Sequence, residues 1–153
     1  SEIQELIPKM WSVMREAGGI GLAAPQIGIS IQLAVIKLEN DSERYDNLED
    51  SEEFIIFNPK LEVLDEKKQG FWEGCLSVPG LRGYVERPRK LKIKYLDEHA
   101  IERQVIVEDF LATVFQHELD HLFGNLYVDR LNSMKDLVFE EEMANIASEK
   151  LLD

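Results

Sequence analysis

The sequence has one cysteine and no long apolar run, and each shortage excludes a class of protein. A single cysteine cannot form an internal disulfide, so the chain suits a reducing compartment better than a secreted, disulfide-stapled scaffold. No apolar stretch approaches the roughly 18 residues that a membrane span needs, and no signal peptide opens the chain. We therefore expect a cytoplasmic protein without membrane partners.

Positive charge is also scarce. Lysine and arginine total 17 against 30 acidic residues, which leaves a net charge of −13. Such a balance repels phosphate backbones, so we expect no direct nucleic-acid binding, and the basic run over residues 82–94 is interpreted as a solvated strand face.

Repeats and low-complexity tracts are absent too. The 153 residues, of which 44% are hydrophobic, suffice for one core, and we expect a single domain over residues 1–153.

Hydrophobic spacing predicts an α+β fold. Short antiparallel or mixed β-sheets are expected to pack around a central helix, with further helices at the two ends of the chain. The expected helices cover residues 3–17, 109–124 (capped by Asp109) and 133–151. The expected strands cover residues 31–38, 54–57, 60–64, 91–96 and 101–107. The connections are a loop over 20–30, a mobile acidic loop over 39–53, a turn at Asn58-Pro59 and a hairpin loop over 97–100.

The middle helix carries the pattern His-Glu-x-x-His at His117, Glu118 and His121. Four residues turn a helix by roughly 400°, so the two imidazoles lie on one face and can reach one metal ion. Glu118 would project beside that ion, where it can take a proton from water. The pattern therefore predicts a metal-dependent hydrolytic site.

Such a site needs a third protein ligand. One candidate is the single cysteine, Cys75, although a free cysteine is more often a small buried residue. The other candidates are Glu140, Glu141 and Glu142, which would match a zinc endopeptidase. The residues alone leave this choice open. A metal-stabilised binding module without activity is a further alternative.

Three segments together resemble the signature motifs of the peptide deformylase family, in the same order. They are Gly19-Ile20-Gly21-Leu22-Ala23-Ala24-Pro25-Gln26, Glu73-Gly74-Cys75-Leu76-Ser77 and Gln116-His117-Glu118-Leu119-Asp120-His121. The resemblance implies a hydrolase that removes the formyl group from N-formylmethionyl nascent peptides and releases formate. It implies that Cys75, His117 and His121 hold one divalent metal ion, with Fe²⁺ in the cell and Zn²⁺, Ni²⁺ and Co²⁺ as alternatives.

The same resemblance assigns roles around the ion. Glu118 would be the general base, and the Gln26 amide and the Leu76 backbone N–H would stabilise the negative charge on the formyl oxygen. The Gly21 backbone would align a peptide that binds as an added strand. The substrate pocket would be lined by Ile20, Phe110, Thr113, Val114 and the His117 ring, and Arg82 would meet the substrate backbone or a carboxylate.

Two departures from the family pattern bear on partners. Family members begin some twenty residues earlier, so we expect their N-terminal segment to be missing. Residues 132–153 hold six acids against two lysines, which makes docking on the ribosome through a basic terminal helix doubtful and leaves only a transient contact. Finally, Asp120 is expected to brace the metal helix by pairing with an arginine, Arg87 in preference to Arg82.

Overall fold

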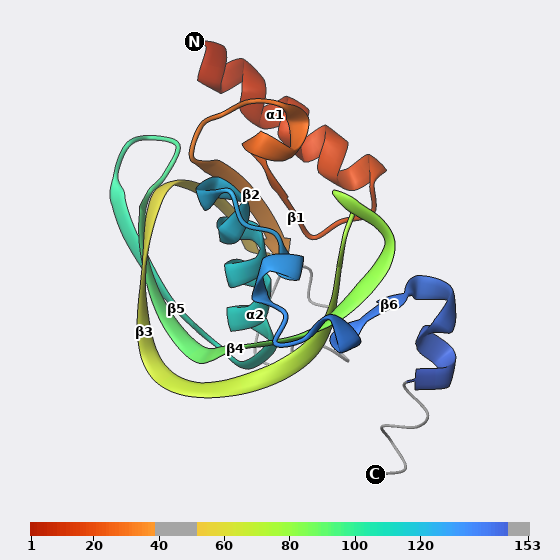
Figure 1. Cartoon of the computed structure of the whole chain (residues 1–153). Coiled ribbons are helices and arrows are strands. Elements are labelled where there is room, and N and C mark those ends of the chain that lie inside the picture. Colours follow the sequence, from red (N-terminus) through yellow and green to blue (C-terminus); the bar gives the residue numbers. More distant parts are fainter. Residues whose placement is uncertain (39–51, 147–153) are drawn as a thin grey trace.

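The computed structural model describes residues 1–38 and 52–146. In this part of the chain six strands form one sheet, and α-helices and several short 3-10 helices pack around it (Figure 1). The helices are α1 (Glu2–Glu16), η1 (Ala24–Ile27), α2 (Asp109–Asp120), η2 (His121–Phe123), η3 (Tyr127–Arg130), η4 (Met134–Asp136) and η5 (Glu140–Glu142). The strands are β1 (Gly21–Ala23), β2 (Leu33–Leu38), β3 (Glu52–Cys75), β4 (Val78–Leu96), β5 (Glu102–Glu108) and β6 (Leu137–Phe139).

The sheet is antiparallel with the order β1-β2-β3-β4-β5, and β6 pairs with β4. The hairpin of β3 and β4 dominates it, with strands of 24 and 19 residues. Four register shifts interrupt the β3–β4 pairing. Because such irregularities bend and twist a strand, the hairpin curls around α2 (Figure 1). This curl carries the tip of the hairpin, at Cys75, back to α2.

β2 separates two apolar layers because its successive side chains point to opposite faces. Leu33 and Val35 pack with Met10 and Met14 of α1 in one cluster of buried residues. The alternate residues of β2 pack under α2, together with residues of β4 and β5. This larger cluster contains Ala34, Ile36, Leu38, Leu91, Ile93, Val107, Phe115 and Leu119. The helix α2 is therefore enclosed by the sheet, as the sequence predicts for its central helix.

Several expectations are confirmed. The α+β class holds, and α1 begins and ends within one residue of its predicted bounds. Its N-terminus is closed by a capping box in which Ser1 accepts a hydrogen bond from the backbone N–H of Gln4. The hairpin loop over residues 97–100 joins β4 to β5, and His99 is an exposed side chain on it.

Two predictions in the first half of the chain are wrong. The expected loop over 20–30 contains β1 and η1, because residues 21–23 pair with β2 although their small side chains give little strand propensity. The expected turn at Asn58-Pro59 is a bulge within the continuous strand β3. Asn58 takes a left-handed conformation (φ 50°) there, which asparagine tolerates, and the pairing with β4 resumes at Lys60.

Two helix predictions also differ in part. The helix α2 begins at Asp109 as expected, but its N-cap residue is Glu108 and not Asp109, whose φ is 58°. The third helix does not span 133–151. Its first part is η4, β6 and η5, since an apolar run at residues 137–139 pairs with β4 instead, and within the described residues a helix covers 143–146.

Residues 39–51 of the predicted acidic loop lie outside the described part of the chain, as do residues 147–153, and its last two residues, 52 and 53, belong to β3. Within the described residues, none of the helices is long and apolar enough to cross a membrane.

Candidate functional site

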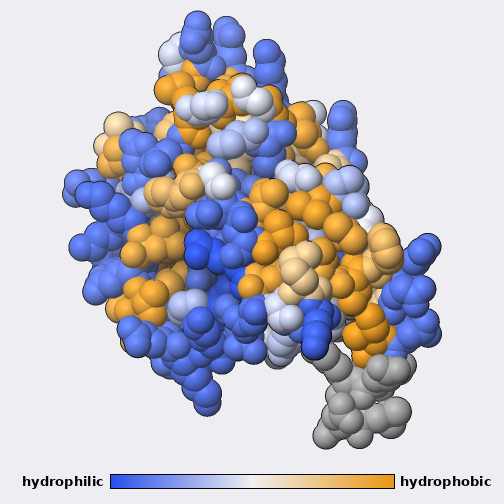
Figure 2. Space-filling model, viewed as in Figure 1, coloured by the Kyte–Doolittle hydropathy of each residue, from blue (hydrophilic) through white to orange (hydrophobic). Residues whose placement is uncertain are grey.

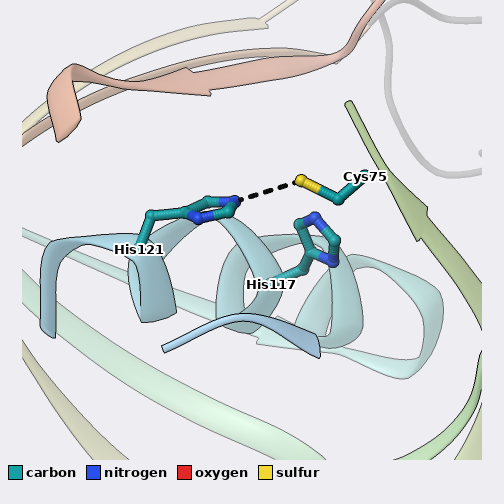
Figure 3. Close-up of side chains that lie close together, drawn as sticks. All are labelled: Cys75, His117 and His121. Carbon is teal, nitrogen blue, oxygen red and sulfur yellow. Dashed lines mark hydrogen bonds between the residues drawn. The ribbon is translucent and has the colours of Figure 1, made fainter. Parts of the chain in front are cut away.

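Cys75, His117 and His121 converge at the point where the tip of the β3–β4 hairpin meets α2. Their ligand atoms all lie within 4.8 Å of one another, and the Cys75 sulfur is 3.6 Å from Nε2 of His121. Figure 3 shows the two imidazole rings rising from the helix toward the sulfur. One thiolate and two imidazoles form a donor set that suits Zn²⁺, Fe²⁺, Ni²⁺ or Co²⁺. The residues present therefore fit a divalent metal ion.

The helix places the two histidines by its own geometry. His117 lies in the last turn of α2, and His121 is the first residue of η2, which continues the helix for one tighter turn. Gly124 then ends η2 in the left-handed conformation (φ 78°), which glycine adopts without strain. His121 is buried, whereas His117 and Cys75 are partly exposed.

The charges of Cys75 and His117 are strongly coupled. Burial alone would raise the pKa of the Cys75 thiol, but hydrogen bonds with His117, His121 and Ser77 lower it to about 5. Burial would lower the pKa of His117, whereas its hydrogen bonds to Cys75 and Glu73 and the charge of Glu118 raise it to about 10. Cys75 is therefore a thiolate at neutral pH, which is the form that binds metals.

A buried ionic network contacts His117 at its Nδ1 atom. The Glu73 carboxylate lies 2.8 Å from Nδ1 of His117 and accepts two further hydrogen bonds from Arg87. Arg87 also donates to Asp120 at 2.8 Å, as the sequence analysis predicted, and Arg130 donates to the same carboxylate. Burial would raise the pKa of Glu73, but its bonds to His117 and Arg87 hold that pKa below its usual value.

Glu118 lies on the inner side of α2 against strand β1. The side chain is buried, and burial raises the pKa of its carboxyl group above the usual value. Within the described residues, its Oε2 atom is buried without a hydrogen-bond partner. A Cβ atom added at Gly21 would lie 2.6 Å from Cγ of Glu118. Glycine is therefore required at residue 21 so that β1 can approach this side chain.

Gln26 presents its amide to the same centre. Its Oε1 accepts a hydrogen bond from the Ala23 backbone N–H at 2.9 Å, which fixes the direction of the amide group. Its Nε2 then lies 3.6 Å from the Cys75 sulfur and 3.3 Å from the Ser77 hydroxyl oxygen. The donor end of the amide is thus held beside the sulfur.

A cavity of about 500 Å³ opens next to the three donors. All the residues that the sequence analysis assigned to the pocket contribute to its wall, namely Ile20, Phe110, Thr113, Val114 and His117, and so does Arg82. Phe71, Trp72, Glu73, Gly74 and Glu118 complete the lining. In Figure 2, which has the same view as Figure 1, apolar side chains gather over the region between α2 and the curled end of β4. The cavity combines apolar side chains with one arginine, one histidine and two carboxylates.

The other candidate residues are not part of the ligand cluster. Among the residues that the structure describes, Cys75, His117 and His121 form the one group of His, Cys or acidic side chains able to share an ion. Glu140 pairs with Arg82 instead. The Leu76 side chain is exposed in the two-residue turn after Cys75, and Leu76, Gly21 and Gln26 are outside the cavity wall.

Sequence reasoning missed Phe71, Trp72 and the contact of Glu73 with His117. The signal was present for Glu73, which lies two residues before Cys75 and so shares its side of an extended strand. The same alternation includes Phe71, two residues before Glu73, whereas Trp72 lies on the opposite parity and had no such signal. Phe71 now packs edge-on against Phe110, with ring centroids 5.2 Å apart.

Comparison with known proteins finds relatives that match nearly the whole chain. A peptide deformylase of Leptospira biflexa is 49% identical over 152 residues, which covers 99% of this chain and 84% of the relative. A peptide deformylase of Pelodictyon phaeoclathratiforme is 42% identical over 148 residues, which covers 97% of this chain and 76% of the relative. The match therefore extends well beyond the three motifs.

Solved structures agree. The peptide deformylase of Synechococcus elongatus in complex with actinonin superposes with a TM-score of 0.76 at 38% identity, covering 88% of this chain and 68% of that one. A class I type b peptide deformylase of Acinetobacter baumannii with bound Met-Ala-Ser gives 0.75 at 34% identity, with 86% and 82% covered. A family model described as polypeptide deformylase matches residues 1–137. The chain belongs to the polypeptide deformylase family.

Proposed function

We propose that this chain is a hydrolase that removes the formyl group from the N-terminal formylmethionine of new polypeptides and releases formate. The observation that carries the proposal is the placement of Cys75, His117 and His121 around one point, with Glu118 and Gln26 beside it. Residues 1–153 would act as one catalytic domain. Family membership over nearly the whole chain supports this reaction over cleavage of internal peptide bonds.

Cys75, His117 and His121 would hold one divalent ion, and the resemblance of the three motifs favours Fe²⁺ in the cell. When bound, the ion would lower the pKa of water and polarise the formyl carbonyl group. The contact between Glu73 and Nδ1 of His117 supports this assignment, because it leaves the other ring nitrogen free to face the ion.

Glu118 would move the proton. Its buried carboxylate, with a pKa raised by burial, takes a proton from the attacking water, whose oxygen bonds to the formyl carbon. The bond between that carbon and the methionine nitrogen then breaks, and Glu118 gives the proton to the leaving amine. The products are formate and a free N-terminus.

Gln26 and Leu76 would stabilise the oxygen on which negative charge develops. The Gln26 amide is already oriented by the Ala23 backbone, so its donor end needs no reorganisation during the reaction. The Leu76 backbone N–H, next to Cys75 in the hairpin turn, would be the second donor. A fixed donor of this kind typically contributes a rate factor of about 10² to 10³.

The cavity would take the methionine side chain, with Ile20, Phe110, Thr113 and Val114 as its apolar wall. The Gly21 backbone would align the peptide as an added strand, and Arg82 would meet the downstream part of the peptide. Hydrogen bonds to the main chain of the peptide do not depend on its side chains. This supports activity on peptides with varied residues after methionine.

The substrates would be nascent chains in the cytoplasm. We propose that contact with the ribosome is transient, because a net charge of −13 opposes binding to RNA phosphates.

The test is formate release from a formyl-methionyl peptide under anaerobic conditions with added Fe²⁺ or Ni²⁺. A Glu118→Ala variant should keep one metal ion per chain and lose about 10²- to 10⁴-fold in rate. Cleavage of an internal peptide bond, or equal rates in both proteins, would contradict the proposal.

A further inference from the structure

The cavity has a charged rim that the proposed reaction leaves unexplained. Arg82, on β4, belongs to the cavity wall, and its Nη2 donates a hydrogen bond of 2.6 Å to Oε1 of Glu140. Glu140 is the first residue of η5 and directly follows β6, which pairs with β4 at residues 81–83. The pairing of the two strands thus brings this carboxylate to the arginine.

The Arg82 guanidinium lies close to the reacting centre. It packs against the backbone of Gly74, one residue before Cys75, and a Cβ atom added at Gly74 would lie 2.7 Å from Cζ of Arg82. The absence of a side chain at residue 74 therefore lets the guanidinium approach the hairpin tip closely. One side of the group faces this backbone, while Glu140 occupies a hydrogen-bonding edge.

We propose that Glu140 sets the charge preference of the peptide site by competing with substrate carboxylates for Arg82. The inference rests on the proposed function and deepens it. With methionine in the apolar part of the cavity, the downstream residues of the peptide pass the rim. A guanidinium fork matches a carboxylate, so Arg82 alone would favour an acidic residue there. Glu140 already occupies Nη2, one of the donors of that fork, and adds a like charge, which disfavours acidic peptides.

The pair is weak enough to be displaced. The side chain of Arg82 is 39% exposed and that of Glu140 is 54% exposed, and water screens ion pairs of this kind. An exposed pair therefore modulates binding and does not lock the site. Its removal should change the affinity for acidic peptides by about two- to five-fold.

The experiment compares pairs of C-terminally amidated formyl-methionyl tripeptides. Each pair carries glutamate or glutamine at the second or third residue, so a side chain is the one carboxylate that differs. For Glu140→Gln, kcat/KM for the glutamate peptide should rise about two- to five-fold relative to the glutamine peptide at one of the two positions. The gain should lie in KM with kcat unchanged, because the pair does not touch the reacting atoms.

Glu141→Gln is the matched control, since it removes the same charge one residue further along η5. It should leave the glutamate-to-glutamine ratio unchanged. Adding Arg82→Gln to Glu140→Gln should abolish the gain, because the carboxylate then has no guanidinium to bind.

An equal change for both peptides in Glu140→Gln, or the same gain in Glu141→Gln, would overturn the inference and leave the proposed function standing. A failure of the unaltered protein to release formate from the glutamine peptides would overturn the proposed function itself, and the inference with it.

Discussion

An oxygen of Glu73 lies 2.8 Å from Nδ1 of His117, and the same carboxylate is held from its other side by Arg87. The contact joins the hairpin to α2 just behind the three candidate ligands. A carboxylate in this position fixes the ring orientation and makes the opposite nitrogen a better metal donor. It also links the ionic network of Arg87 and Asp120 to the metal site.

Glu73→Gln should weaken metal binding by roughly 10- to 100-fold, because the amide keeps an oxygen acceptor but loses the negative charge. Competition with a chelator of known affinity measures the change. Glu86→Gln, at an exposed residue of β4, is the control and should bind metal normally. Equal affinities in the three proteins would show that Glu73 does not act on the site.

Arg87→Met should cost about 3–5 kcal/mol of unfolding free energy, since it removes the buried guanidinium that bonds to both Glu73 and Asp120. Urea unfolding of the metal-free protein measures it. Arg89→Met removes an arginine that is 40% exposed, with ion-pair distances of 3.6–3.8 Å, and should cost less than about 1 kcal/mol. Similar losses in both variants would contradict this account of the network.

The Cys75 thiol should stay reactive in mild acid once metal is removed. Its pKa of about 5, against 9.0 for an ordinary thiol, keeps it deprotonated from neutral pH down to that value. Alkylation by iodoacetamide should therefore vary little between pH 8 and 6 and reach half its maximum near pH 5. Since Cys75 is the only cysteine, mass spectrometry follows it directly.

His117→Ala should move that midpoint to higher pH, because the His117 hydrogen bond is one of the contacts that lower the thiol pKa. Bound metal should protect the thiol in the unaltered protein. A rate that falls tenfold per pH unit below pH 8 would contradict the expected thiolate.

Gly21→Ala should lower kcat by about 10²-fold, because the new methyl group would lie 2.6 Å from Cγ of Glu118 and displace the proposed base. Metal content should stay at the level of the unaltered protein. Gly19→Ala is the control, since a Cβ atom there meets its nearest neighbour at 3.5 Å. Steady-state kinetics measure kcat in both variants. An equal fall in kcat would point to a general effect on the loop.

The sequence predicted those parts of the fold that depend on local periodicity. The amphipathic α1 and the alternation of β5 and of residues 91–96 in β4 are examples, and the pairing of Asp120 with Arg87 was predicted as support for the metal helix. Residues 21–23 and 137–139 escaped prediction, because their strands exist only through pairing with β2 and β4. Asn58 does have a backbone conformation typical of a turn, but the residues around it pair with β4, so it forms a bulge within β3.

The candidate site was predictable where one motif holds several residues, as in His117, Glu118 and His121. The second donor to Asp120, Arg130, lies ten residues further on in η3. Glu140 reaches Arg82 only because β6 pairs with β4. Neither contact has a periodic spacing, so each depends on how the whole chain folds.

The separation of Cys75 from His121 along the chain has a thermodynamic consequence. The two residues are 46 positions apart, and they meet only when the hairpin has closed over α2. An ion held by both would act as a cross-link around this loop and restrict the unfolded chain, much as a disulfide does. The metal would then stabilise the same curl of the hairpin that assembles its ligands. Loss of the ion would therefore destabilise the fold as well as remove the ion from the proposed reaction.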